Sequence, residues 1–156
     1  MIFATVGTQL PFPRLFEALS SIARQLDEPI LGQTAEDQTW PDLETHRFLS
    51  PEKFGDCFQS ARVIVAHAGI GTVLSAQRWQ KPLIIMPRRF DLGEHRNDHQ
   101  QATAKQVGSL TGVYVVSNAE ELGTLLKVQD LTPASSQSSK GKSDLVDYLR
   151  NFISAA

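Results

Sequence analysis

The sequence predicts an α/β domain built on a parallel sheet with helices on both of its faces. Short, unbroken apolar runs such as residues 63–66 (Val-Ile-Val-Ala) are typical of strands that are buried on both sides. Segments with the periodicity of amphipathic helices separate these runs, and this alternation indicates a doubly wound sheet. Two of the runs lead into glycine-containing turns, at Gly7-Thr8 and at Gly69-Ile70-Gly71-Thr72. Ligands of open α/β sheets bind at such turns, outside the carboxyl ends of the strands.

The first elements follow from a change of apolar pattern. Residues 2–6 are a short apolar run that predicts the first strand. A helix follows because apolar residues then recur every three or four positions, namely Phe12, Leu15, Phe16, Leu19, Ile22, Ala23 and Leu26. Pro13 suits the first turn of that helix. Residues 29–33 and 46–49 predict two short strands, with a polar loop at residues 35–42 between them.

The middle of the chain predicts a helix and then a central strand. Residues 51–60 form the helix, with Phe54, Phe58 and Ala61 expected to face inward. Residues 62–66 contain a run of β-branched side chains, which favours a strand in the centre of the sheet.

Residues that stop or start a helix help to locate the elements in the rest of the chain. The remaining strands are expected at residues 83–86 and 113–116, and the remaining helices at residues 72–79, 96–107 and 118–127. Lys81-Pro82 ends the first of these helices and Gly108 ends the second. Ser117 and Glu120 have the spacing of a capping box and predict the start of the third.

Composition narrows the class of protein. The chain has 156 residues, 41% of them apolar and 21% charged, which is typical of one globular domain with a real core. A net charge of −2 provides no general attraction to nucleic acid. The single cysteine, Cys57, excludes an internal disulfide framework and predicts a reducing, cytoplasmic compartment. No apolar run approaches the roughly 20 residues that span a bilayer, so we expect only peripheral membrane contact.

The chain divides into three expected parts. Residues 1–130 form the sheet domain. Residues 131–143 are rich in serine and predict a flexible linker. Residues 144–156 predict an amphipathic helix, with an apolar stripe formed by Leu145, Leu149, Phe152 and Ile153. A helix this short must bury its stripe, either on its own sheet or on another chain.

The turn at residues 67–72 (His-Ala-Gly-Ile-Gly-Thr) predicts an anion site. Gly69 and Gly71 lack Cβ, so the backbone can approach a phosphate closely. Thr72 places a hydroxyl beside the free N–H groups at a helix N-terminus, where the helix dipole favours negative charge. Gly7-Thr8 is a second turn of this kind. The alternative interpretation is two tight turns whose glycines serve only packing.

A charged loop follows residues 83–86. Arg88 is a candidate for charge-assisted contacts to phosphate, or an ordinary surface charge. His95 and His99 have the i, i+4 spacing of a zinc pair, but no further ligands accompany them, so we expect no metal. A polar loop that contacts a ligand is the preferred interpretation. Ser75 and Cys57 lack the local pattern of a catalytic nucleophile.

In combination these motifs resemble the C-terminal domain of glycosyltransferase family 28. The resemblance covers about residues 1–127 and depends on four stretches, namely 3–8 (Phe-Ala-Thr-Val-Gly-Thr) with Phe12 and Leu15, 67–72, 81–88 (Lys-Pro-Leu-Ile-Ile-Met-Pro-Arg) and His99-Gln100. The chain is most similar to single-domain members, which include small subunits of dolichol-linked N-acetylglucosaminyltransferases and of bacterial exopolysaccharide enzymes.

The resemblance implies a Rossmann-like parallel sheet that is the C-terminal half of a GT-B fold and binds a UDP-sugar. The implied site residues are Gly7, Thr8, Gly69, Gly71 and Thr72 at the diphosphate, Phe48 and Leu49 beside the uracil, Gln100 at the sugar hydroxyls, and His67, Arg88 and His99 nearby. The family usually has Glu or Asp at the position of Ser75, where it holds the ribose hydroxyls. No cofactor is implied.

The resemblance also implies a partner. A GT-B enzyme needs two such domains, so the acceptor half of a bipartite, inverting hexosyltransferase is expected on a membrane-anchored subunit that presents a lipid-linked acceptor. The catalytic base is expected there too, with His67 the candidate within this chain. Self-association of the isolated chain is left open. Two alternatives remain, namely a nucleotide-binding regulatory module without activity, and a UDP-sugar hydrolase or epimerase that uses His67.

Overall fold

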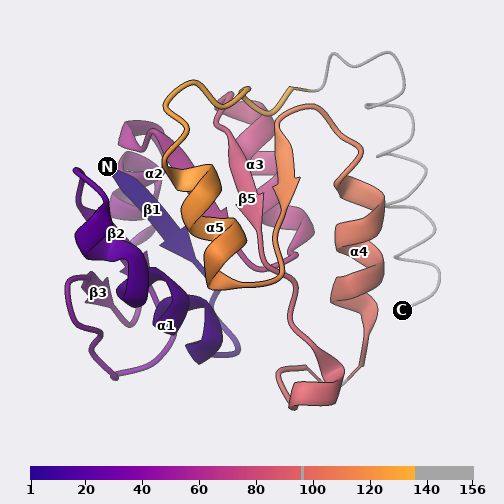
Figure 1. Ribbon diagram of the computed structural model, residues 1–156, viewed down its shortest axis with the longest axis horizontal. Helices are drawn as coiled ribbons and strands as arrows, with labels where there is room; N and C mark the ends of the chain where they lie inside the picture. Colours follow the sequence, from indigo (N-terminus) through magenta and orange to yellow (C-terminus); the bar gives the residue numbers. More distant parts are fainter. Residues whose placement is uncertain (96, 136–156) are drawn as a thin grey trace.

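The computed structural model describes residues 1–95 and 97–135. These residues form a six-stranded, fully parallel sheet with the order β3-β2-β1-β4-β5-β6 (Figure 1). The strands are β1 (Ile2–Thr5), β2 (Ile30–Gln33), β3 (Glu44–His46), β4 (Val63–Ala66), β5 (Leu83–Ile85) and β6 (Val113–Val115). After β1, the chain adds β2 and β3 on one side of it, and then β4, β5 and β6 on the other side. The direction therefore switches between β1 and β4, where ligands of open sheets bind.

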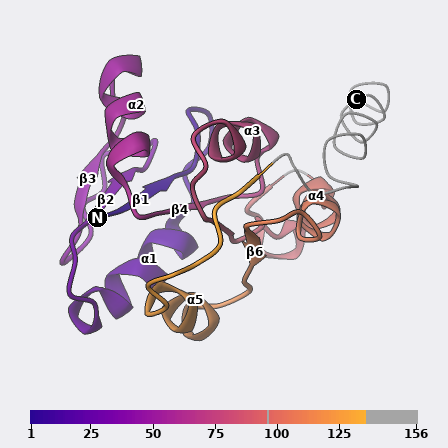
Figure 2. The ribbon, with the colours of Figure 1, turned by 90° about the horizontal axis from the view of Figure 1, so that it is seen from above.

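Helices cover both faces of this sheet, which confirms the predicted fold class. They are α1 (Pro13–Ile22), α2 (Pro51–Ser60), α3 (Ile70–Arg78), α4 (His99–Val107) and α5 (Ala119–Leu126), with short 3₁₀ turns η1 (Ala23–Gln25) and η2 (Phe90–Leu92). Helices α1 and α5 lie on one face, and α2, α3 and α4 lie on the other (Figure 2).

The two faces have separate apolar cores because successive residues of a strand point to opposite sides. In β1, Ile2 and Ala4 pack with α1 and α5, whereas Phe3 packs with α2 and α3. In β4, Val63 and Val65 face the first core and Ile64 and Ala66 the second. All eight residues of β1 and β4 are buried, as the β-branched run at residues 62–66 predicts.

Several boundaries differ from the predictions because local hydrogen bonds override apolar patterns. The strand expected at residues 46–49 is β3, at Glu44–His46. Helix α3 begins at Ile70 rather than residue 72, and α4 begins at His99 rather than residue 96. The N-cap of α5 is Asn118, whose side chain accepts the Glu121 N–H, while the Glu121 carboxylate accepts the Ser117 N–H. The capping box therefore lies one residue later than predicted.

The structure describes five residues of the expected linker, 131–135, and one of them packs into the core of the sheet domain. Ala134 is fully buried, and its N–H donates to the Lys81 carbonyl at 3.0 Å. Gly112 adopts a φ of +76°, and a Cβ there would lie 2.3 Å from the backbone of Ala134. These residues therefore differ from the flexible linker that composition predicts. The rest of the linker and the predicted helix at 144–156 lie outside the described residues.

Candidate functional site

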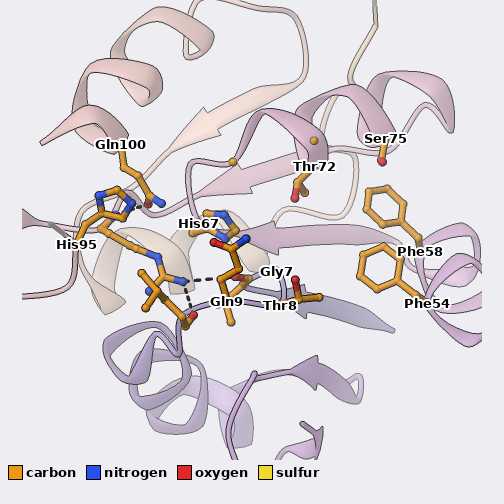
Figure 3. Close-up of a pocket in the computed structure, with 15 residues that line it drawn as sticks. Gly7, Thr8, Gln9, Phe54, Phe58, His67, Thr72, Ser75, His95 and Gln100 are labelled. Carbon is orange, nitrogen blue, oxygen red and sulfur yellow. Dashed lines mark hydrogen bonds between the residues drawn. The ribbon is translucent and has the colours of Figure 1, made fainter. Parts of the chain in front are cut away.

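A cavity of about 690 Å³ opens at the carboxyl ends of β1 and β4 (Figure 3). Its walls come from the loop after β1, the turn between β4 and α3, one side of α2, and the loop between β5 and α4. The lining residues are Val6, Gly7, Thr8, Gln9, Leu10, Phe54, Phe58, His67, Gly69, Gly71, Thr72, Ser75, Arg88, His95 and Gln100. Nine of the twelve residues that the sequence analysis assigned to the site line this cavity, which leaves Phe48, Leu49 and His99 outside it.

Two buried polar side chains, Gln33 and Arg88, donate hydrogen bonds to the backbone of the loop after β1. Gly7 has a φ of +78°, in the left-handed region that favours glycine. Gln33, only 2% exposed, donates from Nε2 to the Gly7 carbonyl at 3.2 Å. Its Oε1 accepts the Leu49 N–H at 2.8 Å. One side chain of β2 therefore fixes both the Gly7 turn and the segment that leads into α2.

Arg88 is the second of these side chains, and its contacts with the loop are called the brace of the Gly7 turn below. Its guanidinium donates to the carbonyls of Pro11 at 2.6 Å, Leu10 at 2.5 Å and Val6 at 3.4 Å. It also lies 4.9 Å from the centre of the Phe12 ring, a cation–π distance. Arg88 is 2% exposed, and this burial lowers its pKa to about 10, so it remains charged at neutral pH. The side chain predicted to contact phosphate thus organises the Gly7 loop and adds a fixed positive charge under the cavity.

The turn between β4 and α3 presents open backbone to the cavity. Gly69 is the N-cap of α3, and a Cβ there would lie 2.5 Å from Nε2 of His67. A Cβ on Gly71 would meet no atom of the described residues outside its own helix within 4 Å. The first N–H groups of a helix have no acceptor within the helix, and its dipole is positive at that end. The side chain of Thr72 points into the same space (Figure 3).

His67 lies between the two glycine turns. Its ring sits over Gly69, and Cε1 would lie 3.4 Å from a Cβ on Gly7. Burial, together with the positive charge of Arg88 and the nearby His95, lowers the pKa of His67 to about 4. The imidazole is therefore neutral at pH 7. Its Nδ1 is buried and has no hydrogen-bond partner among the described residues.

Polar side chains from the loop before α4 form one end of the cavity. Gln100, in the first turn of α4, accepts the Arg88 N–H on Oε1 at 3.0 Å. Its amide nitrogen makes no hydrogen bond to the described residues. His95 lies beside Gln100 (Figure 3), with Nδ1 3.1 Å from Oδ1 of Asn97. His99 is exposed and does not line the cavity, so its predicted contact with a ligand stays a prediction.

The loop before α4 is fixed by an ion pair to α1. Arg14 donates from Nε to Oε2 of Glu94 at 2.8 Å and from Nη2 to the Pro87 carbonyl at 3.0 Å. Glu94 also accepts the Arg89 N–H at 2.9 Å. The backbone that carries Arg88 and His95 is therefore anchored at both sides.

Aromatic side chains of α2 form the other end of the cavity. Phe54 and Phe58 line it, and both pack edge-on against Phe3 of β1. Phe48, predicted to flank a base, is 48% exposed outside the cavity beside Arg47. Leu49 packs into the core of the α2 face instead. The strand boundary explains where these two residues lie: β3 ends at His46, and the chain enters α2 with Ser50 as N-cap.

Sequence reasoning missed five further lining residues, namely Val6, Gln9, Leu10, Phe54 and Phe58, and it singled out His95 only as half of a histidine pair. Phe54 and Phe58 were assigned to the core from their helical spacing, and both do contact it. Gln9 and Leu10 follow directly after Gly7-Thr8, so the length of the turn was the available signal.

The electrostatics of the cavity suit an anion. No Asp or Glu is present among the described lining residues, whereas Arg88 supplies a buried positive charge. Within residues 1–95 and 97–135, no three His, Cys, Asp or Glu side chains gather as metal ligands. No helix in the same part of the chain is long and apolar enough to cross a membrane.

The fully parallel sheet, with a cavity where the strand order switches between β1 and β4, is the arrangement of open α/β domains. Residues 1–147 match the family model of the glycosyltransferase family 28 C-terminal domain, and the chain belongs to that family. A curated relative is the UDP-N-acetylglucosamine transferase subunit ALG13 of Eremothecium gossypii, 29% identical over 130 residues. That match covers 76% of this chain and 64% of the relative's length.

Solved structures share the fold, which matches one half of a GT-B glycosyltransferase. An NMR structure of ALG13 has a TM-score of 0.57 at 19% identity and covers 91% of both chains. The glycotransferase of kitacinnamycin has a TM-score of 0.62 at 18% identity, over 96% of this chain and 38% of that one. UDP-glucose: anthocyanidin 3-O-glucosyltransferase in complex with UDP also scores 0.62, at 16% identity, over 96% of this chain and 34% of that one.

Proposed function

We propose that this chain is the donor-binding subunit of a glycosyltransferase and that its cavity takes a UDP-sugar. One observation carries this function: the open first turn of α3, the braced Gly7 loop and the buried charge of Arg88 all meet at one cavity without a carboxylate among its described lining residues. A diphosphate needs backbone donors and positive potential together.

The two ends of the cavity suit the two ends of a nucleotide-sugar. Phe54 is half-buried and offers an apolar surface to the base, with the fully buried Phe58 packed behind it. The glycine turns offer N–H groups to the diphosphate. The sugar then lies toward Gln100 and His95, whose polar atoms can meet its hydroxyls. A cavity of about 690 Å³ is within the size range of ligand pockets.

A second polypeptide supplies the acceptor half in this proposal. The relative from Eremothecium gossypii is named as a subunit, and the NMR structure of ALG13 shares the fold over 91% of both chains. The low pKa of His67, about 4, makes it a poor base at neutral pH, which favours a base on the partner. The partner would be membrane-anchored, hold a lipid-linked acceptor for an inverting transfer in exopolysaccharide or glycan synthesis, and recruit this chain to the cytoplasmic membrane surface.

The test begins with binding of UDP to the isolated chain. We expect NMR titration to shift backbone signals of Gly7, Gly71 and Thr72. Gly71→Val places a branched side chain in open cavity space, so it should abolish binding while the protein stays folded. Unchanged UDP affinity in a folded Gly71→Val protein contradicts the site.

Reconstitution tests the activity. The chain mixed with membranes that contain the encoded partner should transfer sugar from a UDP-sugar to a lipid-linked acceptor, and neither component should do so alone. Sugar release by the isolated chain that is lost in His67→Ala would instead favour a hydrolase.

A further inference from the structure

Among the described residues, no carboxylate lines the end of the cavity where the proposed function places the nucleoside. The described side chains at this end are Phe54 and Phe58 from α2 and Ser75 from α3. The nearby loop carries Asp91, Glu94 and Asp98, and none of them lines the cavity. The Glu94 carboxylate is held by Arg14 and the Arg89 N–H, and Asp91 accepts from Arg89. The strongest acceptor for a sugar hydroxyl is therefore absent from the described residues of this end.

The geometry of α3 sets what Ser75 faces. Gly71 and Ser75 are four residues apart, so they lie one above the other on the same face of the helix. A diphosphate on the first turn of α3 would leave the next group of a nucleotide one turn further along, beside Ser75. Figure 3 shows Ser75 and Thr72 on the same side of α3, with Phe54 and Phe58 across from Ser75. The ribose would thus lie between Ser75 and the aromatic rings.

A carboxylate and a serine treat ribose differently. In dinucleotide sites, an acidic side chain accepts a charge-assisted hydrogen bond from the ribose 2′-hydroxyl and thereby selects for it. A serine hydroxyl makes a neutral bond, and it can rotate toward another partner. Because Ser75 is only half-buried, water can replace a missing 2′-hydroxyl without stranding a polar group.

We propose that this site does not select for the ribose 2′-hydroxyl, so that it takes 2′-deoxyribonucleotide-sugar donors as readily as ribonucleotide ones. This rests on the proposed function, since it needs a nucleoside diphosphate in the cavity. Ser75 is the specificity-determining position: it lines the cavity where the sugar of the nucleoside lies, and it provides one neutral hydroxyl.

The test compares UDP with 2′-deoxy-UDP, which differ by one hydroxyl, in NMR titrations of the full chain. We expect dissociation constants within about five-fold of each other, because a neutral, solvent-accessible hydrogen bond has little net value. A preference for UDP of more than about five-fold overturns the inference, and leaves the proposed function in place. If neither nucleotide binds at millimolar concentrations, the proposed function fails and this inference with it.

A matched pair of variants tests the position of Ser75. Ser75→Glu should create a preference for UDP of about ten-fold or more, through a charge-assisted bond to the 2′-hydroxyl. Ser75→Gln has nearly the same size without the charge and should keep the wild-type ratio. The ratio is the readout because a new negative charge weakens both diphosphates alike. If the ratio of the two dissociation constants is unchanged in folded Ser75→Glu, then the ribose does not lie beside Ser75 and the explanation is overturned.

Discussion

The two glycine turns of this domain look alike in sequence and differ in what their glycines do. Gly7 needs glycine for its backbone, because its φ is +78°, and its turn is tied down by Gln33 and Arg88. Gly71 has ordinary helical backbone, and a Cβ there would meet none of the described residues outside its own helix within 4 Å. The first glycine shapes the fold, whereas the second would leave room for a ligand if the proposed function holds. The same residue type in the same kind of turn is therefore not evidence of the same role.

Removing the brace of the first turn should have the largest effect on stability. Arg88→Met leaves the carbonyls of Val6, Leu10 and Pro11 without their donor. A stranded buried acceptor costs about 1–3 kcal/mol, and only the Val6 carbonyl is fully buried while the other two are partly so. We therefore expect the free energy of unfolding to fall by about 3–5 kcal/mol in total. Urea denaturation measures it. Arg88→Lys should lose less, since it keeps the charge but not the planar set of donors. A loss below about 1 kcal/mol in Arg88→Met would mean that the brace is dispensable.

His67, which lies between the two glycine turns, should make the free energy of unfolding depend on pH. Because the folded-state pKa of His67 is about 4, below its ordinary value of 6.5, the unfolded chain binds the proton more tightly. Stability from this group is complete above about pH 6.5 and is lost as the pH falls toward 4. At 1.36 kcal/mol per pKa unit, the loss is about 3 kcal/mol. The difference between wild type and His67→Phe in urea denaturation should change over this window. If the free energies of unfolding of the two proteins change with pH in parallel, then the pKa of His67 lies near its ordinary value.

Paired alanine substitutions separate the roles of the two glycines. Gly7→Ala should cost about 1–2 kcal/mol of stability, because an L-residue is strained in the left-handed region. Gly71→Ala should keep or slightly raise stability, since alanine favours a helix over glycine by up to about 1 kcal/mol. It should weaken UDP binding roughly ten-fold, because its methyl group enters the cavity. Thermal denaturation and UDP titration of both variants measure the two effects. Equal losses of stability would mean that the two glycines do not have different roles.

The sequence predicted most of the sheet and the centre of the site, for reasons that these residues make clear. The run at 63–66 is buried on both faces, and such a pattern depends little on the rest of the fold. The glycine turns follow directly from the strand ends, so Gly7, Gly69 and Gly71 could be placed early. Phe48 could not, because its position depends on where β3 ends and on the buried bond between Gln33 and the Leu49 N–H. The brace by Arg88 is also invisible in sequence, since it joins residues 77–82 positions apart.

The smallest expected effect concerns Gln100, at the end of the cavity away from the aromatic rings. Its Oε1 already accepts the Arg88 N–H, so only its amide N–H groups remain to donate to a ligand. In the reconstituted enzyme, Gln100→Ala should reduce use of the UDP-sugar more than binding of UDP, by about 0.5–1.5 kcal/mol for one lost hydrogen bond. Gln100→Glu is the matched control, because it keeps an acceptor for the Arg88 N–H and removes the donors. The new charge of Gln100→Glu weakens UDP and UDP-sugar alike, so the readout is the ratio of UDP-sugar use to UDP binding. If the amide serves the sugar, that ratio should fall in Gln100→Glu at least as far as in Gln100→Ala. If only Gln100→Ala is impaired, and equally for UDP and UDP-sugar, then Gln100 acts by holding Arg88 and belongs with the brace of the first turn.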